Sequence, residues 1–341
     1  MQRVADGKIL TRAEAEATME EILSGRVETP EIVSLLLGMN ARPIHPQELA
    51  GFAAVMRRHA APVFAEERLK PAHLVDTCGT GGDGCDTFNI STAAAIIAAA
   101  AGAYVAKHGN RAASSRCGSA DVLEALGVRV DIPLQRSGDA IRELGLGFLF
   151  APTAHAATRH AIAARKQVGV RTAFNLLGPL TNPAGAHSQV VGVYSADVVD
   201  VMAATLAELG TQRALVVHGA DGLDEISLSG ETFVAEIHNG KVRRFTVTPE
   251  DFGVARSPIE TLRGATESEN PAAENATFIR NVLDNEPGPR RDVARINAAA
   301  ALVVAGLAKN FRDGAQLAAH SISSGAAKEK LAALIAFTNA N

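Results

Sequence analysis

The segment DTCGTGGDGCDTFNIST, residues 76–92, joins a glycine-rich turn to the polar start of a predicted helix. Its glycines allow main-chain N–H groups to approach a ligand closely. Asn89, Ser91 and Thr92 stand where the helix begins, and the free N–H groups and dipole of a helix start favour an anion. The segment fits neither G-x-x-x-x-G-K-[ST] nor G-x-G-x-x-G. We interpret it as a phosphate-binding loop of another kind; the alternative is a glycine-rich turn without a ligand.

A second polar segment, KHGNRAASSRCGSAD at residues 107–121, contains no large aliphatic or aromatic side chain. It carries three cations and three hydroxyls, on Lys107, Arg111, Arg116, Ser114, Ser115 and Ser119. If the strands before the two segments are parallel neighbours, both segments reach the same edge of the sheet. Glycine amides on one side and cations on the other would then surround a polyanion of phosphate type. The alternative is a solvated charged loop.

The segment HGADGLDEIS, residues 218–227, follows another predicted strand and carries the adjacent carboxylates Asp224 and Glu225, with Asp221 near them. These charges repel one another unless a cation lies between them. Mg²⁺ prefers one or two carboxylates with water and phosphate oxygens, so the pair predicts magnesium opposite the two phosphate-type loops. The alternative is a solvated turn. Between these segments, residues 155–186 carry Arg159, Arg165, Lys166 and Arg171. One of them could hold a carboxylate by a bidentate contact, whereas solvation at the surface is the expected role of most of them.

The elements that must position these loops alternate between strand and helix from residue 73 onward. Strands are predicted at 73–77, 104–107, 128–131, 148–151, 189–194 and 213–218, and helices at 91–102, 119–127, 134–145 and 196–210. This alternation is typical of a largely parallel α/β sheet. Asn239-Gly240 between two alternating runs predicts a type I′ hairpin, so the sheet should be mixed, with an antiparallel edge. Residues 270–340 are predicted to be helical.

The first 68 residues show helix signals only. Thr11 and Glu14 form a T-x-x-E capping box before a helix ending at Gly25. Thr29 and Pro30 predict a second helix start, with an end at Gly38. Pro46 opens a third amphipathic helix. These patterns predict a small helical domain.

Composition limits the classes of function. The 341 residues are 47% hydrophobic with a net charge of −4, which predicts a folded protein and argues against nucleic-acid or membrane-surface binding. Cys78, Cys85 and Cys117 form no C-x-x-C pair and favour a reducing, cytoplasmic location. Residues 1–20 do not resemble a signal peptide, and the apolar run 92–106 is shorter than the roughly 20 residues of a membrane span.

Four segments in this order resemble the motifs of the anthranilate phosphoribosyltransferase family: DTCGTGGDGCDTFNIST, KHGNR…SS…GSADVLEALG, RTAFNLLGPLTNPA and DGLDEIS. The resemblance covers essentially the whole chain. It implies a homodimer with a small helical domain at 1–70, completed by about 165–185, and a large α/β domain at 71–341, an architecture similar to that of nucleoside phosphorylases. It also implies transfer of the phosphoribosyl group of 5-phosphoribosyl 1-diphosphate (PRPP) to anthranilate in tryptophan biosynthesis, with pyrophosphate as second product.

The resemblance also implies the site residues. Carried over by position, PRPP is expected to contact Gly79, Gly82, Asp83, Thr87, Asn89, Ile90, Ser91, Thr92, Lys107, His108, Gly109, Asn110, Arg111, Ala112, Ala113, Ser114, Ser115 and Ser119. Anthranilate is expected at Gly79, Asn110 and Arg165, and magnesium, with two ions per subunit, at Ser91, Asp224 and Glu225. No residue is expected to act as a covalent nucleophile, because the amine of anthranilate is already neutral at pH 7.

Some positions differ from the common family pattern. Ala156 and Ala163 stand where prolines are frequent, near Arg165. Within the second polar segment, Ala112, Ala113, Arg116 and Cys117 replace a more serine-rich, lysine-bearing version. Arg116 keeps the positive charge and the two alanines remove possible hydroxyl contacts, so we expect the differences in this segment to change affinity more than reaction type.

Two other functions are compatible with parts of this pattern. A pyrimidine nucleoside phosphorylase would bind phosphate within a similar architecture, but it has no evident use for the Asp224-Glu225 pair. A non-catalytic nucleic-acid-binding relative would need a basic stripe and salt-sensitive binding, whereas this chain is mildly acidic.

Overall fold

A seven-stranded sheet forms the centre of the computed structural model, which describes residues 2–112 and 116–340. Its order is β3-β2-β1-β4-β5-β6-β7, and the neighbours from β3 to β5 are all parallel. The strands are β1 (Leu74–Asp76), β2 (Tyr104–Gly109), β3 (Leu146–Phe150), β4 (Ser188–Gly192), β5 (Arg213–Gly219), β6 (Thr232–His238) and β7 (Lys241–Val247). The antiparallel β6–β7 hairpin turns at Asn239 and Gly240, both with positive φ. The predicted mixed, mostly parallel sheet is therefore confirmed.

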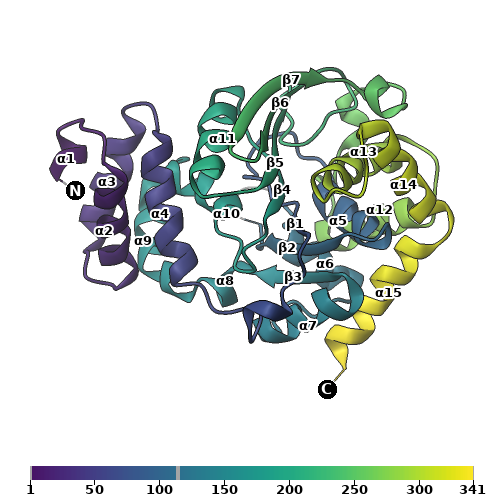
Figure 1. Ribbon diagram of the computed structural model, residues 1–341, viewed down its shortest axis with the longest axis horizontal. Coiled ribbons are helices and arrows are strands. Elements are labelled where there is room, and N and C mark those ends of the chain that lie inside the picture. Colours follow the sequence, from purple (N-terminus) through teal and green to yellow (C-terminus); the bar gives the residue numbers. More distant parts are fainter. Residues whose placement is uncertain (1, 113–115, 341) are drawn as a thin grey trace.

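Helices cover both faces of the sheet (Figure 1). Alanine-rich α5 (Ile90–Ala100) and α13 (Pro289–Val304) pack against each other with α14 (Phe311–Ser323), because small side chains allow close approach of helices. The opposite face carries α11 (Val199–Glu208) over β5 and β6. Around the sheet lie α6 (Ser119–Leu126), α7 (Leu134–Leu144), α8 (Ala151–Ala154), α12 (Pro271–Leu283) and α15 (Ala326–Asn339). No helix of the described ranges is long and apolar enough to cross a membrane.

A helical bundle stands at one end of the molecule, on the left in Figure 1. It contains α1 (Gln2–Ala5), α2 (Arg12–Leu23), α3 (Thr29–Asn40) and α4 (Pro46–Arg58). A segment from the middle of the chain, α9 (Arg159–Val168), packs on α2 and α3, and α10 (Leu177–Leu180) packs on α4. The rings of Phe52 and Phe174 meet edge to face with centroids 5.9 Å apart. The bundle and segment 159–180 thus share one core, while the domain boundaries stay a prediction.

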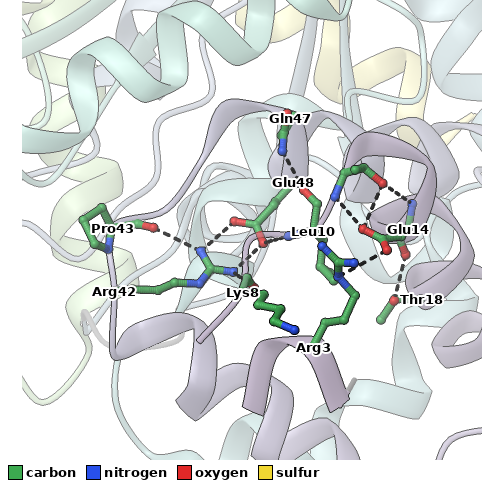
Figure 2. A network of polar contacts seen from close by, with 10 residues as sticks. Arg3, Lys8, Leu10, Glu14, Thr18, Arg42, Pro43, Gln47 and Glu48 are labelled. Carbon is green, nitrogen blue, oxygen red and sulfur yellow. Dashed lines mark hydrogen bonds and ion pairs between the residues drawn. The ribbon is translucent and has the colours of Figure 1, made fainter. Parts of the chain in front are cut away.

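A buried carboxylate ties the connections of this bundle together (Figure 2). Glu48 is fully buried and accepts two hydrogen bonds from the Arg42 guanidinium, at 2.8 and 2.5 Å, and a third from the Leu10 main-chain N–H at 2.9 Å. Gln47 donates to the Leu10 carbonyl at 2.8 Å. The chain before α2 is therefore anchored to the start of α4 by charged and polar contacts.

Several local predictions were accurate and others were wrong. Thr11 and Glu14 form the predicted capping box. The second helix is capped by Glu28 instead of Thr29, and it continues through Gly38, where the missing side chain lets Val4 pack closely. Residues 128–131 form no strand: Val128 and Val130 are buried, but the Arg129 N–H is bound by the Thr338 hydroxyl of α15 and not by a neighbouring strand. The alternating Val128 and Val130 side chains belong instead to the hydrophobic core that also contains residues of α15.

Candidate active site

Strand β1 lies between β2 and β4. From β1 the strand order proceeds through β2 to β3 on one side and through β4 to β5 on the other, so β1 marks the switch in strand order. Ligands of open parallel sheets bind at such a point, beyond the carboxyl ends of the strands. Of the segments that leave the sheet at this edge, three carry the polar residues in question: the glycine loop (77–89) after β1, the basic loop (110–118) after β2, and the acidic loop (220–231) after β5. Parallel pairing thus brings the three segments selected from the sequence to one edge.

The glycine and acidic loops touch directly. The Gly81 N–H donates to Asp224 Oδ2 at 2.8 Å, and the Asp224 N–H donates to Asp83 Oδ2 at 3.2 Å. Gly81 and Gly82 have φ values of +64° and +76°, which glycine adopts without strain. The glycine loop therefore presents at least one N–H group to an anionic oxygen, here a carboxylate.

The carboxyl groups of Asp224 and Glu225 are electrostatically unfavourable next to each other. Desolvation by the surrounding protein raises the pKa of Asp224 to about 7, and repulsion by the Asp83 carboxylate raises it further. Asp224 is nevertheless partly exposed. The pKa of Glu225 is raised by desolvation and by Asp224, while Lys107 and the Ser91 N–H oppose the shift. Glu225, Ser91 and Thr77 line the same small cavity. A cation bound there would relieve this repulsion.

These groups fit magnesium better than a metal that needs a full set of protein ligands. The described residues hold no cluster of three or more His, Cys, Asp or Glu side chains placed to bind a metal. Two carboxylates and the Ser91 hydroxyl leave coordination positions for water and phosphate oxygens, which is how Mg²⁺ is usually held. Ser91, Asp224 and Glu225 could therefore hold it only together with substrate or water.

Asp221 does not add to the acidic pair. Its Oδ2 accepts hydrogen bonds from the Ser227 and Ser229 hydroxyls, both at 2.5 Å, and its Oδ1 accepts from the Leu223 N–H at 3.2 Å. This carboxylate therefore shapes the acidic loop from within.

Lys107 is buried beneath the glycine loop. Its Nζ donates to Ser91 Oγ at 3.1 Å and to the Thr77 carbonyl at 3.2 Å. Asp76, fully buried nearby, accepts from the His108 N–H at 3.1 Å. Burial raises the pKa of Asp76 to about 6, opposed by the Asn182 side chain and by Lys107. Lys107 thus places positive charge beside Ser91 instead of on the surface of the basic loop.

The basic loop is closed by a residue that sequence reasoning did not select. Asp121 Oδ2 accepts from the main-chain N–H groups of Ala112 and Gly118, both at 2.9 Å, and Oδ1 accepts from Arg111 at 3.1 Å. Arg111 also makes two contacts with Glu124, at 2.5 and 2.7 Å. The Arg111 guanidinium is therefore paired with carboxylates, and a phosphate contact would require it to exchange these partners.

The other predicted contacts lie around the same edge. Arg116 donates to the Thr266 and Ser268 carbonyls, which ties the basic loop to the segment before α12. The main-chain carbonyl of the exposed residue Asn110 accepts from the Ser119 hydroxyl at 3.3 Å. Gly79 lies against Gly192 and Asp224, and Gly109 lies against Ser119. Thr87 bridges to Arg263, and Asn89, Ile90 and Thr92 form the start of α5. Ala113, Ser114 and Ser115 lie outside the described residues.

His108 is buried with its ring 5.2 Å from that of His155 and its Nδ1 3.1 Å from the Gly178 carbonyl. Desolvation lowers the pKa of His108 to about 3. A neutral imidazole cannot supply charge to a phosphate, so any PRPP contact of His108 would not involve an imidazolium.

The basic residues of 155–186 separate into different environments. Arg165 is exposed on α9, and desolvation by neighbouring protein lowers its pKa. Arg171 reaches the glycine loop: its guanidinium donates to the Gly82 carbonyl and lies over the Tyr194 ring at 4.7 Å from the centroid. Sequence reasoning noted Arg171 but assigned it no role. It missed Gly192 and Asn297, which line the same small cavity as Glu225. The isolated Asn within the apolar run INAAAALVV was a usable signal.

The domain pair identifies the class of protein. Residues 1–60 match the helical bundle domain of a glycosyl transferase family, and residues 71–328 match its a/b domain. The protein has therefore the two-domain architecture of a glycosyl transferase.

Individual relatives narrow this class. An anthranilate phosphoribosyltransferase of Pelotomaculum thermopropionicum is 48% identical over 340 residues, covering 99% of this chain and 95% of the relative. The crystal structure of the enzyme of that name from Thermus thermophilus superposes with a TM-score of 0.92 at 44% identity, covering 99% of each chain. That from Saccharomyces cerevisiae in complex with PRPP and Mg has a TM-score of 0.84 at 27% identity, covering 96% of this chain and 93% of that one. The chain belongs to the anthranilate phosphoribosyltransferase family of pentosyl transferases.

Proposed function

We propose that this chain transfers the 5-phosphoribosyl group of PRPP to the amine of anthranilate, with magnesium-assisted departure of pyrophosphate. The contact between the Gly81 N–H and the Asp224 carboxylate, 2.8 Å long, carries the proposal, because it joins the phosphate-type loop to the acidic pair. The yeast relative in complex with PRPP and Mg, and its counterpart in complex with 4-fluoroanthranilate, support the same ligands for this chain.

The PRPP site would use the glycine loop, the start of α5 and the basic loop, with the residues named from the sequence. Ser91, Asp224 and Glu225 would hold two Mg²⁺ ions; bound there, magnesium would neutralise the charge of pyrophosphate and make it a better leaving group. Lys107, 3.1 Å from Ser91 Oγ, would keep positive charge at this end of the site. Arg165 would orient the anthranilate carboxylate, and Asn110 and Gly79 would place its ring.

The chemistry requires no covalent enzyme intermediate. The bond from the ribose anomeric carbon to the pyrophosphate oxygen breaks as the anthranilate nitrogen forms its bond to the same carbon from the opposite face. The nitrogen then loses one proton to solvent or to pyrophosphate. Positive charge develops on the ribose ring in this oxocarbenium-like transition state, so positioning and charge neutralisation would supply most of the rate enhancement.

We further propose that the protein is a cytoplasmic homodimer, with small and large domains divided near residue 70. Three exposed apolar side chains, on the helical bundle and on the segment packed against it, support a subunit contact there. Leu37 on α3 is 49% exposed, and Ile162 on α9 and Val170 just after it are 59% and 63% exposed. Analytical ultracentrifugation of the full chain and of a Leu37→Glu, Ile162→Glu variant tests this, and a wild-type monomer at micromolar concentration contradicts it.

The activity can be tested with purified protein, PRPP, anthranilate and Mg²⁺. The fluorescence of anthranilate and its product is readable because the chain contains no Trp. We expect Mg²⁺-dependent consumption of PRPP and no phosphorolysis of thymidine. Phosphorolysis without PRPP turnover, or salt-sensitive DNA binding without any turnover, would reject the proposal.

Two substitutions separate the roles. Asp224→Asn combined with Glu225→Gln should remove most turnover at ordinary Mg²⁺ concentration, and near-normal activity contradicts the metal assignment. Arg165→Ala should raise the KM for anthranilate, whereas an effect confined to PRPP shows that this residue is misassigned. Arg159→Ala, on the same helix, serves as the control for loss of a cation.

A further inference from the structure

Asn297 is a buried amide in the middle of α13, a helix otherwise filled with alanine and aliphatic side chains at this level. It is 3% exposed. Asparagine is a weak helix former, and a polar group buried among apolar side chains is unfavourable unless it is hydrogen-bonded. The position therefore requires a compensating interaction.

That interaction is with the acidic loop. Asn297 Oδ1 accepts from the Ile226 N–H at 3.0 Å, and Asn297 Nδ2 donates to the Ile226 carbonyl at 3.0 Å. The same Nδ2 donates to the Val293 carbonyl, one turn earlier in α13, at 3.0 Å. Ile226 lies outside the strands of the sheet, so the side-chain amide replaces the strand neighbour that its main chain lacks.

Ile226 directly follows Glu225, and Glu225 and Asn297 line the same small cavity with Ser91. The main chain bends at Asp224 and Glu225 instead of continuing as a strand. In a regular strand two consecutive side chains would point to opposite faces. The bend must therefore be held in place for both carboxylates to act at one site, and the nearest fixed point after it is the bond pair at Ile226.

We propose that Asn297 is a positioning residue for the metal pair: it fixes the main chain at Ile226 so that Asp224 and Glu225 can bind the same metal–pyrophosphate complex. This inference rests on the proposed function, since it assigns Asn297 a role in the metal site. Asn297 itself need not touch either substrate or metal.

The test measures metal binding apart from turnover. Mn²⁺ is titrated into the full chain with PRPP and without anthranilate, and free Mn²⁺ is followed by electron paramagnetic resonance. For Asn297→Ala we expect the Kd for Mn²⁺ to rise at least fivefold. In activity assays, the Mg²⁺ concentration for half-maximal rate should rise similarly, with recovery of the rate at high Mg²⁺.

Two further variants separate positioning from general stability. Asn297→Ser is expected to keep a bond to the Val293 carbonyl, as helical serines commonly do, but its side chain is too short to reach Ile226. It should weaken Mn²⁺ binding as Asn297→Ala does, with a smaller fall in Tm. Thr338→Ala, near the end of α15, deletes a buried hydroxyl that accepts a hydrogen bond from the Arg129 N–H at 3.2 Å. This variant should lower Tm while changing the Kd for Mn²⁺ less than twofold.

The outcomes are distinct. If the wild-type chain with PRPP binds no Mn²⁺, the metal assignment of the proposed function is wrong. If the wild type binds Mn²⁺ and both folded Asn297 variants bind it within twofold of the wild type, the inference about Asn297 is wrong. An equal loss of affinity in Thr338→Ala would also overturn it, because the effect would then follow stability alone.

Discussion

The α-carbon of Gly192, the last residue of β4, packs directly against the main-chain carbonyl oxygen of Asp224. A Cβ on Gly192 would overlap that oxygen. The Gly192 carbonyl meanwhile accepts from the Thr80 N–H at 2.9 Å. One residue without a side chain thus contacts both the glycine loop and the acidic loop.

We therefore expect Gly192→Ala to displace the acidic loop and to reduce kcat/KM for PRPP at least tenfold. The overlap is with main chain, which cannot rotate away as a side chain could. Gly230→Ala is the matched control, because a Cβ there meets no atom within 4 Å. Steady-state kinetics at several Mg²⁺ concentrations measure the effect, and equal activities of the two variants would contradict the packing argument.

Asp121 provides a second prediction, for the basic loop. Its carboxylate binds the N–H groups of Ala112 and Gly118, so Asp121→Asn loses charge-assisted bonds at both ends of the loop. We expect the KM for PRPP to rise about tenfold, with little change in the KM for anthranilate. Asp131→Asn, which removes only an exposed contact with Arg129, should leave both values unchanged. An unchanged KM for PRPP in Asp121→Asn would show that the loop does not depend on this carboxylate.

A third prediction concerns stability. Glu48→Gln leaves the Arg42 guanidinium without its charged partner in a largely buried site, where side-chain exposures are 12% for Arg42 and 0% for Glu48. Breaking a buried ion pair from one side costs about 3–5 kcal/mol, so we expect a loss near the lower value, since Gln keeps one acceptor. Glu21→Gln, in an exposed pair with Arg26, should change the stability far less, because water screens both charges. Urea unfolding of the two variants compares these costs.

The buried histidines predict how stability depends on pH. His108 has a folded pKa near 3, mainly through desolvation, whereas an unfolded histidine has a pKa of about 6.5. Between these values the unfolded chain binds a proton that the folded chain does not, so stability is lost as the pH falls below about 6.5. From pH 6.5 to 5.5 this one group should cost about 1 kcal/mol.

His108→Asn should remove that part of the pH dependence. We expect the variant to lose about 1 kcal/mol less than the wild type between pH 6.5 and 5.5 in urea unfolding. His73→Asn, at an exposed position, is the control. Identical pH profiles of His108→Asn and the wild type would refute the prediction.

Features that depend on residues close together in the sequence were predicted better than features that depend on residues far apart in it. Residue types at short spacing predicted the Thr11–Glu14 capping box and the Asn239-Gly240 hairpin. The rule that parallel strands end at a common edge predicted that the three loops meet. The 128–131 segment was misread because apolar alternation does not show whether a strand neighbour is present. Gly192 and Asn297 escaped notice because their roles exist only through contacts with Asp224 and Ile226, which the sequence does not place beside them.

Arg171 connects the helical bundle to the glycine loop by hydrogen bonds. Asn40, at the end of α3, donates to the Arg171 carbonyl at 2.6 Å, and the Arg171 side chain donates to the Gly82 carbonyl. A short series of polar contacts therefore runs from the helix carrying Leu37 to the loop proposed to hold PRPP. If Leu37 lies in a subunit contact, this series offers a physical route for linkage between dimer dissociation and PRPP affinity. Reciprocity then requires PRPP to change the dimer dissociation constant by the same factor by which dimerisation changes PRPP affinity, and sedimentation with and without PRPP measures that factor.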